Sequence, residues 1–312
     1  MFTNRHSRYS IALCLGLVIA ALAGGAASAR SLHQERTSPL AGKRFDRRVD
    51  LLFATGGYAD GTIVRAYKGR VHQLGHLRYP AWNPIASDDG RWIEFGAHTP
   101  GSSNIGVMHA DGRHARIIPH TLNCYPGGWG PNASWIAAGC GTFVPGGDVN
   151  LVELDPKTGS VVRHVGTIPP GESPSVSRTT GAIAYCDLDG SVYTVDPATG
   201  TRLKIATEKE GSSAPAWSPD GRKLSFFSQS GAGGEIETVN ADGSGQKAIR
   251  RIRTWQADFA LTYSANGRWI VYGGSSDRTH DLYLIGADGK TRTRLTRIGS
   301  VGDPSSVPRA DN

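Results

Sequence analysis

The sequence contains little of what helical bundles and zinc-binding domains are built from. Its 312 residues include only 2 Met and 4 Cys, and only 20% are Asp, Glu, Lys or Arg. Glycine is abundant instead, at 41 residues, and glycine destabilises the interior of helices. The 7 Trp, 10 Tyr and 8 Phe suffice for a hydrophobic core, which argues against intrinsic disorder. The composition therefore favours an all-β protein.

Familiar catalytic and metal-binding motifs are absent as well. The chain has no GxSxG nucleophile elbow, no HExxH and no phosphate-binding GxxxxGK[ST]. It has no CxxC, and its 10 His are scattered without the spacing of metal ligands. We therefore expect no enzyme and no obligatory cofactor.

The first 29 residues have the pattern of a secretory signal peptide. Arg5 and Arg8 precede an uncharged apolar run over 11–22, and small residues end at Ala29. We expect cleavage after Ala29 and a secreted or periplasmic chain. A retained membrane anchor is the alternative, which the shortness of the apolar run disfavours. Residues 30–49 are polar and lack apolar periodicity, which predicts a flexible linker.

Three cysteines remain after this cleavage: Cys124, Cys140 and Cys186. Cys124 and Cys140 flank a predicted hairpin that turns near Asn132, so they face each other across its two strands. In an oxidising compartment this geometry predicts a disulfide between them. A Cys140–Cys186 bond and three free buried thiols are the alternatives, and the pairing of Cys186 stays open.

An internal repeat is the most informative feature of the sequence. Its clearest copy covers 214–227, which contains Trp-Ser-Pro-Asp-Gly-Arg and a β-prone run, and continues to an Asn-Ala-Asp-Gly turn at 240–243. The copies are marked by Trp82, Trp129, Val176, Trp217 and Tyr263, which are 47, 47, 41 and 46 residues apart. Repeats of about 45 residues with four short strands each are typical of a β-propeller.

The two ends of the chain predict how such a ring closes. Residues 50–54, 62–69 and 70–74 resemble the second, third and fourth strands of a repeat that lacks its first strand. Residues 303–308 resemble a lone first strand, with Val307 lying 44 residues after Tyr263. We therefore predict a six-bladed propeller over residues 50–308, with four antiparallel strands per blade. Segment 301–308 pairs with 50–75 in this prediction, and 309–312 form a tail.

The repeat resembles that of the TolB-type β-propeller family, whose WD-like copies carry the same turn motif. The resemblance covers roughly residues 50–308 and is most specific around 214–243. TolB-type proteins are periplasmic and carry an additional N-terminal α/β domain that works with outer-membrane partners. Only 30–49 precede the propeller here, so we expect that domain and its partner-binding role to be absent.

A candidate site follows from the propeller geometry. Residues that precede the innermost strands should lie around one mouth of the central channel. Counting four positions back from each marker, and including the acidic neighbour of Phe259, gives Arg78, Tyr125, Glu172, Ser213, Asp258 and Asp303. Glu172, Asp258 and Asp303 could bind Ca²⁺ or a basic peptide group there. The alternative is that these carboxylates cap turns and stay solvated.

These observations together predict a monomeric, non-catalytic binding or scaffolding module that recognises a protein or peptide of the cell envelope. The alternative is an extracytoplasmic hydrolase or lyase for glycans or peptides, because catalytic groups dispersed among blades escape a motif search. Two basic clusters, 250–253 and Arg292, Arg294 and Arg297, suggest an anionic cell-wall or membrane surface, or simply a solvated face. Export makes nucleic acid an improbable partner.

Overall fold

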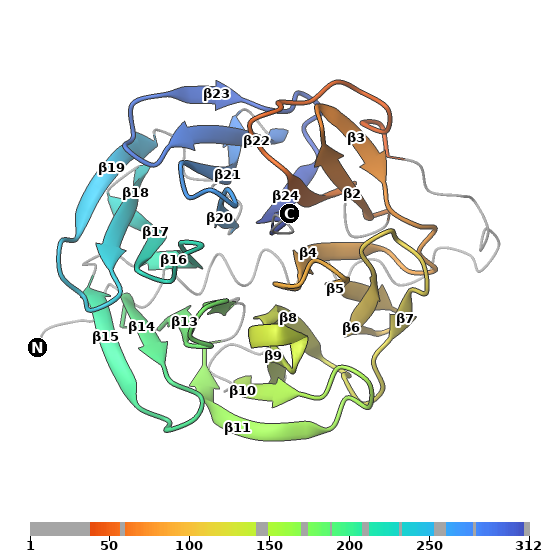
Figure 1. Cartoon of the computed structure of the whole chain (residues 1–312), viewed down its shortest axis with the longest axis horizontal. Helices are drawn as coiled ribbons and strands as arrows, with labels where there is room; N and C mark the ends of the chain where they lie inside the picture. Colours follow the sequence, from red (N-terminus) through yellow and green to blue (C-terminus); the bar gives the residue numbers. More distant parts are fainter. Residues whose placement is uncertain are drawn as a thin grey trace, which may run out of the picture.

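The computed structural model describes residues 38–56, 60–141, 149–169, 174–187, 189–207, 212–230, 233–252, 260–276 and 279–308. They form six four-stranded antiparallel sheets around a central axis, like the blades of a propeller (Figure 1). The only helical element among these residues is a 3-10 turn, η1 (Pro131–Ala133). No helix in the described ranges is long and apolar enough to cross a membrane. The predicted all-β, six-bladed propeller is confirmed.

The strands of each blade run outward from the axis in chain order, except in blade 6, whose innermost strand is β24. Blades 1 to 3 consist of β4–β7 (Ala81–Ala86, Trp92–Thr99, Ser102–His109, Arg116–Ile117), β8–β11 (Cys124–Trp129, Ile136–Gly141, Val149–Leu154, Val161–Ile168) and β12–β15 (Ser175–Val176, Ile183–Cys186, Ser191–Val195, Arg202–Thr207). Blades 4 to 6 consist of β16–β19 (Ser212–Trp217, Lys223–Ser230, Gly233–Asn240, Lys247–Ile252), β20–β23 (Leu261–Tyr263, Trp269–Ser276, Thr279–Gly286, Arg292–Arg294) and β24, β1, β2 and β3 (Val301–Ser306, Leu51–Thr55, Thr62–Tyr67, Arg70–Gln73).

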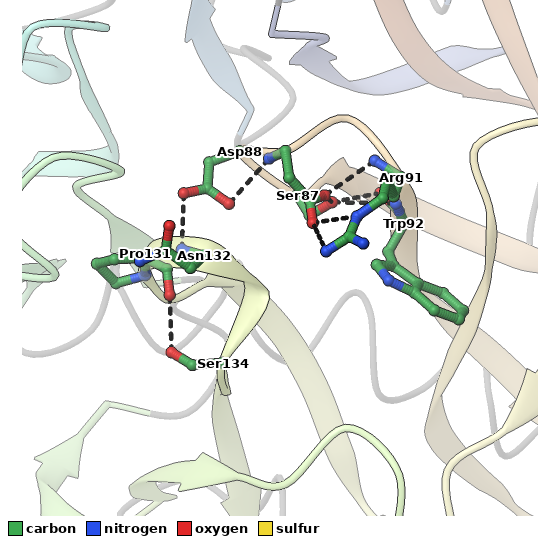
Figure 2. A network of polar contacts seen from close by, with 8 residues as sticks. Ser87, Asp88, Arg91, Trp92, Pro131, Asn132 and Ser134 are labelled. Carbon is green, nitrogen blue, oxygen red and sulfur yellow. Dashed lines mark hydrogen bonds and ion pairs between the residues drawn. The ribbon is translucent and has the colours of Figure 1, made fainter. Parts of the chain in front are cut away.

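The turn between the first and second strands of a blade explains the repeated Ser-x-Asp-Gly motif. In blade 4 the Ser218 hydroxyl donates to Asp220 Oδ1 (2.6 Å) and accepts from the N–H of Lys223 (2.9 Å). Gly221 has a φ of 68°, which is in the left-handed region that favours glycine. The same network recurs at Ser87, Asp89 and Trp92 in blade 1 (Figure 2) and at Ser264, Asn266 and Trp269 in blade 5.

Neighbouring turns also contact one another around the ring. In blade 1 the Asp88 carboxylate accepts from the N–H of Asp89 (2.9 Å) and from the N–H of Asn132 (2.7 Å), which belongs to blade 2 (Figure 2). In blade 4 a Cβ on Gly221 would lie 2.1 Å from Thr179 Oγ1 of blade 3. The turn residues therefore help to set the spacing of the blades.

The ring closes in blade 6, where the C-terminal segment joins the first strands of the domain. β24 pairs antiparallel with β1, with Ser306 opposite Leu51. Val307 packs with Leu52 in the apolar cluster shared with blade 1. The whole of β1 is buried, so it needs this partner on its inner side. The predicted closure by the C-terminal segment is confirmed.

We expected residues 30–49 to form a flexible linker, but residues 38–49 pack against blade 6 instead. The N–H of Gly42 donates to the carbonyl of Val71 (2.8 Å), and the N–H of Val71 donates to the carbonyl of Lys43 (3.0 Å). Phe45 stacks on Phe53 with ring centroids 5.7 Å apart. The segment thus covers the outer edge of β3, where backbone groups would otherwise be unpaired. The predicted signal peptide (1–29) and tail (309–312) lie outside the described residues.

Six apolar clusters form the core, one between each pair of neighbouring blades. Between blades 4 and 5, for example, Phe227 and Ile236 pack with Tyr263 and Ile270. Burying one large apolar side chain contributes about 1.5–3 kcal/mol. Because every cluster needs residues of two blades, the stability of each blade depends on both of its neighbours.

Cys124 in β8 and Cys140 in β9 stand opposite each other in the strand register and are joined by a disulfide. The hairpin between them turns at η1, which includes Asn132, as the spacing predicts. Cys186 in β13 is a buried thiol, so the alternative Cys140–Cys186 bond is not formed.

Candidate functional site

A cavity of about 130 Å³ lies on the propeller axis, and all six innermost strands contribute to its wall. Its polar lining includes Asn83, Ser175, Arg178, Thr262, Asp303 and Ser305. A ligand at this place can contact every blade at once. We therefore take this axial cavity as the candidate functional site.

Four of the innermost strands are bulged beside the cavity. The antiparallel register shifts within β4, β8, β16 and β24, and in β4, β16 and β24 a residue with positive φ precedes a proline at the shift. These residues are Asn83 (φ 44°), Ala214 (φ 52°) and Asp303 (φ 51°). Proline has no N–H to donate, which explains why the ladder is interrupted at these points. A non-glycine residue in this region costs about 1–3 kcal/mol, and such residues cluster at functional sites.

The bulges bring Asn83 and Asp303 together at the wall of the cavity. The backbone N–H of Asn83 donates to Asp303 Oδ2 (3.2 Å), and Asn83 Nδ2 donates to the carbonyl of Pro126 (3.2 Å). These bonds connect β24, β4 and β8, which belong to three successive blades of the ring. The first of these bonds attaches one oxygen of the Asp303 carboxylate to the bulge of β4.

Arg178 crosses the axis at the end of the cavity where the innermost strands finish. It follows β12 in blade 3, and its Nη2 donates to the carbonyl of Ser306 (2.8 Å) and to that of Ala86 (3.4 Å). These are the last residues of β24 and β4. Blade 3 stands opposite blade 6 (Figure 1), so the side chain spans the channel.

The guanidinium of Arg178 is a cation in a desolvated place. Desolvation lowers the pKa of Arg178 to about 10, and the charge of Asp88 offsets this effect only in part. Arg178 therefore stays charged at neutral pH. Within the described ranges it forms no ion pair, and only Nη2 of its three nitrogens is hydrogen-bonded. The axial cavity thus offers donors at Arg178 and a carboxylate acceptor at Asp303.

The structure separates the residues that the sequence placed at the channel mouth. Asp303 lines the cavity, whereas Ser213 lies in β16 just before the bulge. Tyr125 is buried, and Gly139 leaves room for its ring. Arg78 precedes β4, and its guanidinium lies over the Tyr79 ring at 5.2 Å.

The remaining two predicted residues, Glu172 and Asp258, lie outside the described residues. The Ca²⁺ site that would combine them with Asp303 therefore stays a prediction. In the part of the chain that the structure describes, no three His, Cys, Asp or Glu side chains are grouped to hold a metal ion.

Arg78 lies away from the cavity because the first repeat marker is shifted by four residues. In blade 4 the N–H of Ser218 donates to the carbonyl of Lys223, and in blade 1 the corresponding bond starts from Ser87. The residue equivalent to Trp217 is therefore Ala86 and not Trp82. The shift arose because Trp82-Asn83-Pro84 imitates Trp-Ser-Pro, although its proline belongs to the bulge.

Sequence reasoning missed Arg178 and Asn83. The available sign for Arg178 is that Ser177-Arg178 stands where Ser218-Pro219 stands in blade 4. For Asn83 the sign is a proline that recurs at the same position of three innermost strands. The residues that precede this proline are Asn83, Ala214 and Asp303. Neither sign shows that the side chains meet at the axis.

The basic cluster on blade 5 has partners within the fold. Arg292 Nε donates to the hydroxyl of Tyr272 (3.0 Å), and the guanidinium lies 4.3 Å from the ring centroid of Tyr283. Arg294 forms an ion pair with the buried Asp281. These arginines therefore stabilise blade 5, whatever surface they also face.

No family model matches the sequence. Among solved structures the chain is similar to TolB from Acinetobacter baumannii, with a TM-score of 0.73 and 15% identity over 85% of this chain and 68% of that one. The fold is that of a TolB-type propeller. Similar propellers include a chain of the nidogen–laminin complex (TM-score 0.63, 13% identity, 83% and 98% covered) and an oligogalacturonate lyase from Vibrio parahaemolyticus (TM-score 0.52, 14%, 84% and 78%). Identities this low establish the fold alone.

Proposed function

We propose that this protein is an extracytoplasmic, non-catalytic binding module that takes a polar side chain of a protein partner into the axial cavity. The observation that carries the proposal is Arg178, which spans the channel with donors left over and faces a cavity whose wall holds the Asp303 carboxylate. A ligand group that accepts a hydrogen bond from Arg178 and donates one to Asp303 satisfies the hydrogen-bonding needs of both side chains.

The size of the cavity supports a side chain as the occupant. Its volume of about 130 Å³ is well below the roughly 300–1,000 Å³ of sites for free small molecules. A side chain presented by a folded partner also gains contact area on the rim of the ring, which a small isolated ligand lacks. The similar fold in the nidogen–laminin complex is consistent with a role in protein binding.

The extracytoplasmic location is supported by two features. The N-terminal sequence predicts a signal peptide, and a disulfide joins Cys124 to Cys140. Disulfides of this kind persist in oxidising compartments and are rare in the cytosol.

Affinity capture from a cell-envelope fraction tests the proposal. We expect one protein to be retained by the wild type and lost with Arg178→Ala, because that change removes the guanidinium donors from the cavity. Arg113→Ala is the matched control, since Arg113 is a strongly exposed arginine far from the axis. Equal retention by the wild type and by Arg178→Ala would contradict the proposal.

A hydrolase or lyase with its site in the same channel is the second candidate, because oligogalacturonate lyases share the fold. A turnover screen with glycans and peptides separates the two functions. Turnover that disappears with Asp303→Asn supports the enzyme, whereas a retained partner without turnover supports the binding module.

A further inference from the structure

A second cavity, of about 580 Å³, lies between blades 4 and 5. It shares Ser218 and Pro219 with the wall of the axial cavity and extends between the turn of blade 5 and strands of blade 4. We call it the inter-blade cleft. The side chains that give it polar character are Asp220, Lys223, Thr238, Lys247 and Asn266.

The cleft lies at a position of the internal repeat that a tryptophan occupies in blades 1, 2 and 5, whereas Ala182 stands there in blade 3 and Asp50 in blade 6. The N–H of the residue after the innermost strand donates to the carbonyl of a tryptophan in three blades, at Trp92, Trp135 and Trp269. The corresponding bond in blade 4 goes to Lys223. Lys223 therefore occupies the position that a tryptophan occupies in blades 1, 2 and 5.

The three tryptophans fill the space that is hollow beside blade 4. Trp92 packs against the cluster between blades 1 and 2, Trp135 against that between blades 2 and 3, and Trp269 against that between blades 5 and 6. A buried tryptophan covers about 150–250 Å². A lysine directs its ammonium toward water and leaves such a volume unfilled.

The cleft carries an excess of positive charge. Lys223 Nζ donates to Asn240 Oδ1 (2.7 Å), a neutral partner that leaves its charge uncompensated. The ammonium group of Lys247, on β19, makes no hydrogen bond or ion pair with any described residue. The Asp220 carboxylate is the counter-charge, and it is already engaged by the Ser218 hydroxyl (2.6 Å) and the N–H of Arg222 (3.1 Å).

We propose that the inter-blade cleft binds a small organic anion of about the size of one sugar acid or sugar phosphate. The ammonium groups of Lys223 and Lys247 bind the anionic group, and Asn266 and Thr238 offer hydrogen bonds to hydroxyls. A volume of about 580 Å³ is within the roughly 300–1,000 Å³ of small-molecule sites. The cleft adjoins the axial cavity, but none of these four ligand-binding residues lines that cavity, so the proposal does not depend on the partner site.

Calorimetric titration tests the proposal with glucuronate, glucose 6-phosphate and neutral glucose as probes. We expect at least one of the anions to bind the wild type with a Kd of about 1 mM or tighter, and glucose not to bind. The anion that binds more tightly identifies a carboxylate or a phosphate as the preferred group.

Three variants locate the binding. Lys223→Trp, which introduces the residue of blades 1, 2 and 5, and Lys247→Gln should each weaken binding at least tenfold. Lys157→Gln, at an exposed turn of blade 2, removes one positive charge elsewhere and should leave binding unchanged. Circular dichroism checks that each variant is folded. Equal binding of glucose, binding that survives Lys223→Trp, or no binding of either anion would overturn the proposal.

Discussion

Deleting residues 301–312 should open the propeller and destabilise it. The deletion removes β24, which is the innermost strand of blade 6 and the partner of β1. It also removes Val307, which packs between blades 6 and 1, and Val301, which packs between blades 5 and 6. The inner edge of β1, which is buried along its length, would face water.

The loss can be sized from these contacts. Each buried valine contributes about 1.5–3 kcal/mol, and each ladder hydrogen bond contributes about 0.5–1.5 kcal/mol. Two valines and several ladder bonds give roughly 5–10 kcal/mol. The net stability of a domain is only about 5–15 kcal/mol. At about 2–4 °C per kcal/mol, we expect the Tm to fall by at least about 10 °C, or the cooperative transition to disappear.

Thermal unfolding followed by circular dichroism measures this effect. Deletion of 309–312 alone is the control, because it keeps β24 and should leave the Tm unchanged. A circular permutant that joins residue 308 to residue 50 through a short turn should melt cooperatively and above the 301–312 deletion, because it places β24 before β1 as in the other blades. It should melt below the wild type, because it lacks segment 38–49. A chain ending at residue 300 that melts like the wild type would refute closure by β24.

Three further changes test other parts of the structure. Burial raises the pKa of Glu94 well above its usual range, so the folded protein favours the protonated carboxyl. Stability is therefore lost as the pH rises above the pKa that Glu94 has in the unfolded chain. Glu94→Gln should flatten this decline when urea midpoints are measured against pH. Asp281→Asn should cost about 1.5–3 kcal/mol in urea unfolding at pH 7, because it weakens the hydrogen bonds that the buried carboxylate accepts from Thr296 and from the N–H of Ile298, while the exposed Arg294 is hydrated instead. In the wild type, the desolvation of Asp281 is outweighed by hydrogen bonds that lower its pKa, so this stabilisation is lost only as the pH falls through the acidic range; a midpoint equal to that of the wild type would contradict the role of the pair. Replacing Cys124 and Cys140 with serine should cost about 2–4 kcal/mol, and a reductant should lower the wild-type urea midpoint but not that of the variant.

The fold could be predicted from the sequence because its determinants are local and repeated. A serine, an aspartate or asparagine and a glycine within one turn form the same hydrogen bonds in blades 1, 4 and 5, so each copy predicts the others. The closing strand was predictable because the N-terminal repeat, 50–74, lacks a first strand and the C-terminal segment, 303–308, resembles one. Segment 38–49 was missed because its contacts with β3, about 28 residues away, leave no periodicity in its own sequence.

The axial site was only partly predictable, since its contacts are distant in the chain. Arg178 bonds to carbonyls that lie 92 and 128 residues away, and backbone carbonyls have no sequence signature. Asp303 was predicted because it lies four positions before Val307, the marker of the closing strand. Arg78 was wrongly aligned with Asp303 because the pattern Trp-x-Pro occurs within β4, at Trp82, but at the end of β16, at Trp217.

The departures from the repeat are the best guide to function in this chain. Arg178 stands in the place of a proline and Lys223 in that of a tryptophan, while Glu94 occupies the position of Ala137 and Val271. Each of these residues carries a cost: a desolvated cation, a groove that no tryptophan fills and a fully buried carboxyl. The other blades show that the fold needs none of them. Residues that break a local rule without a gain in stability are expected at functional sites, so the axial cavity and the inter-blade cleft are where substitutions should alter binding more than folding.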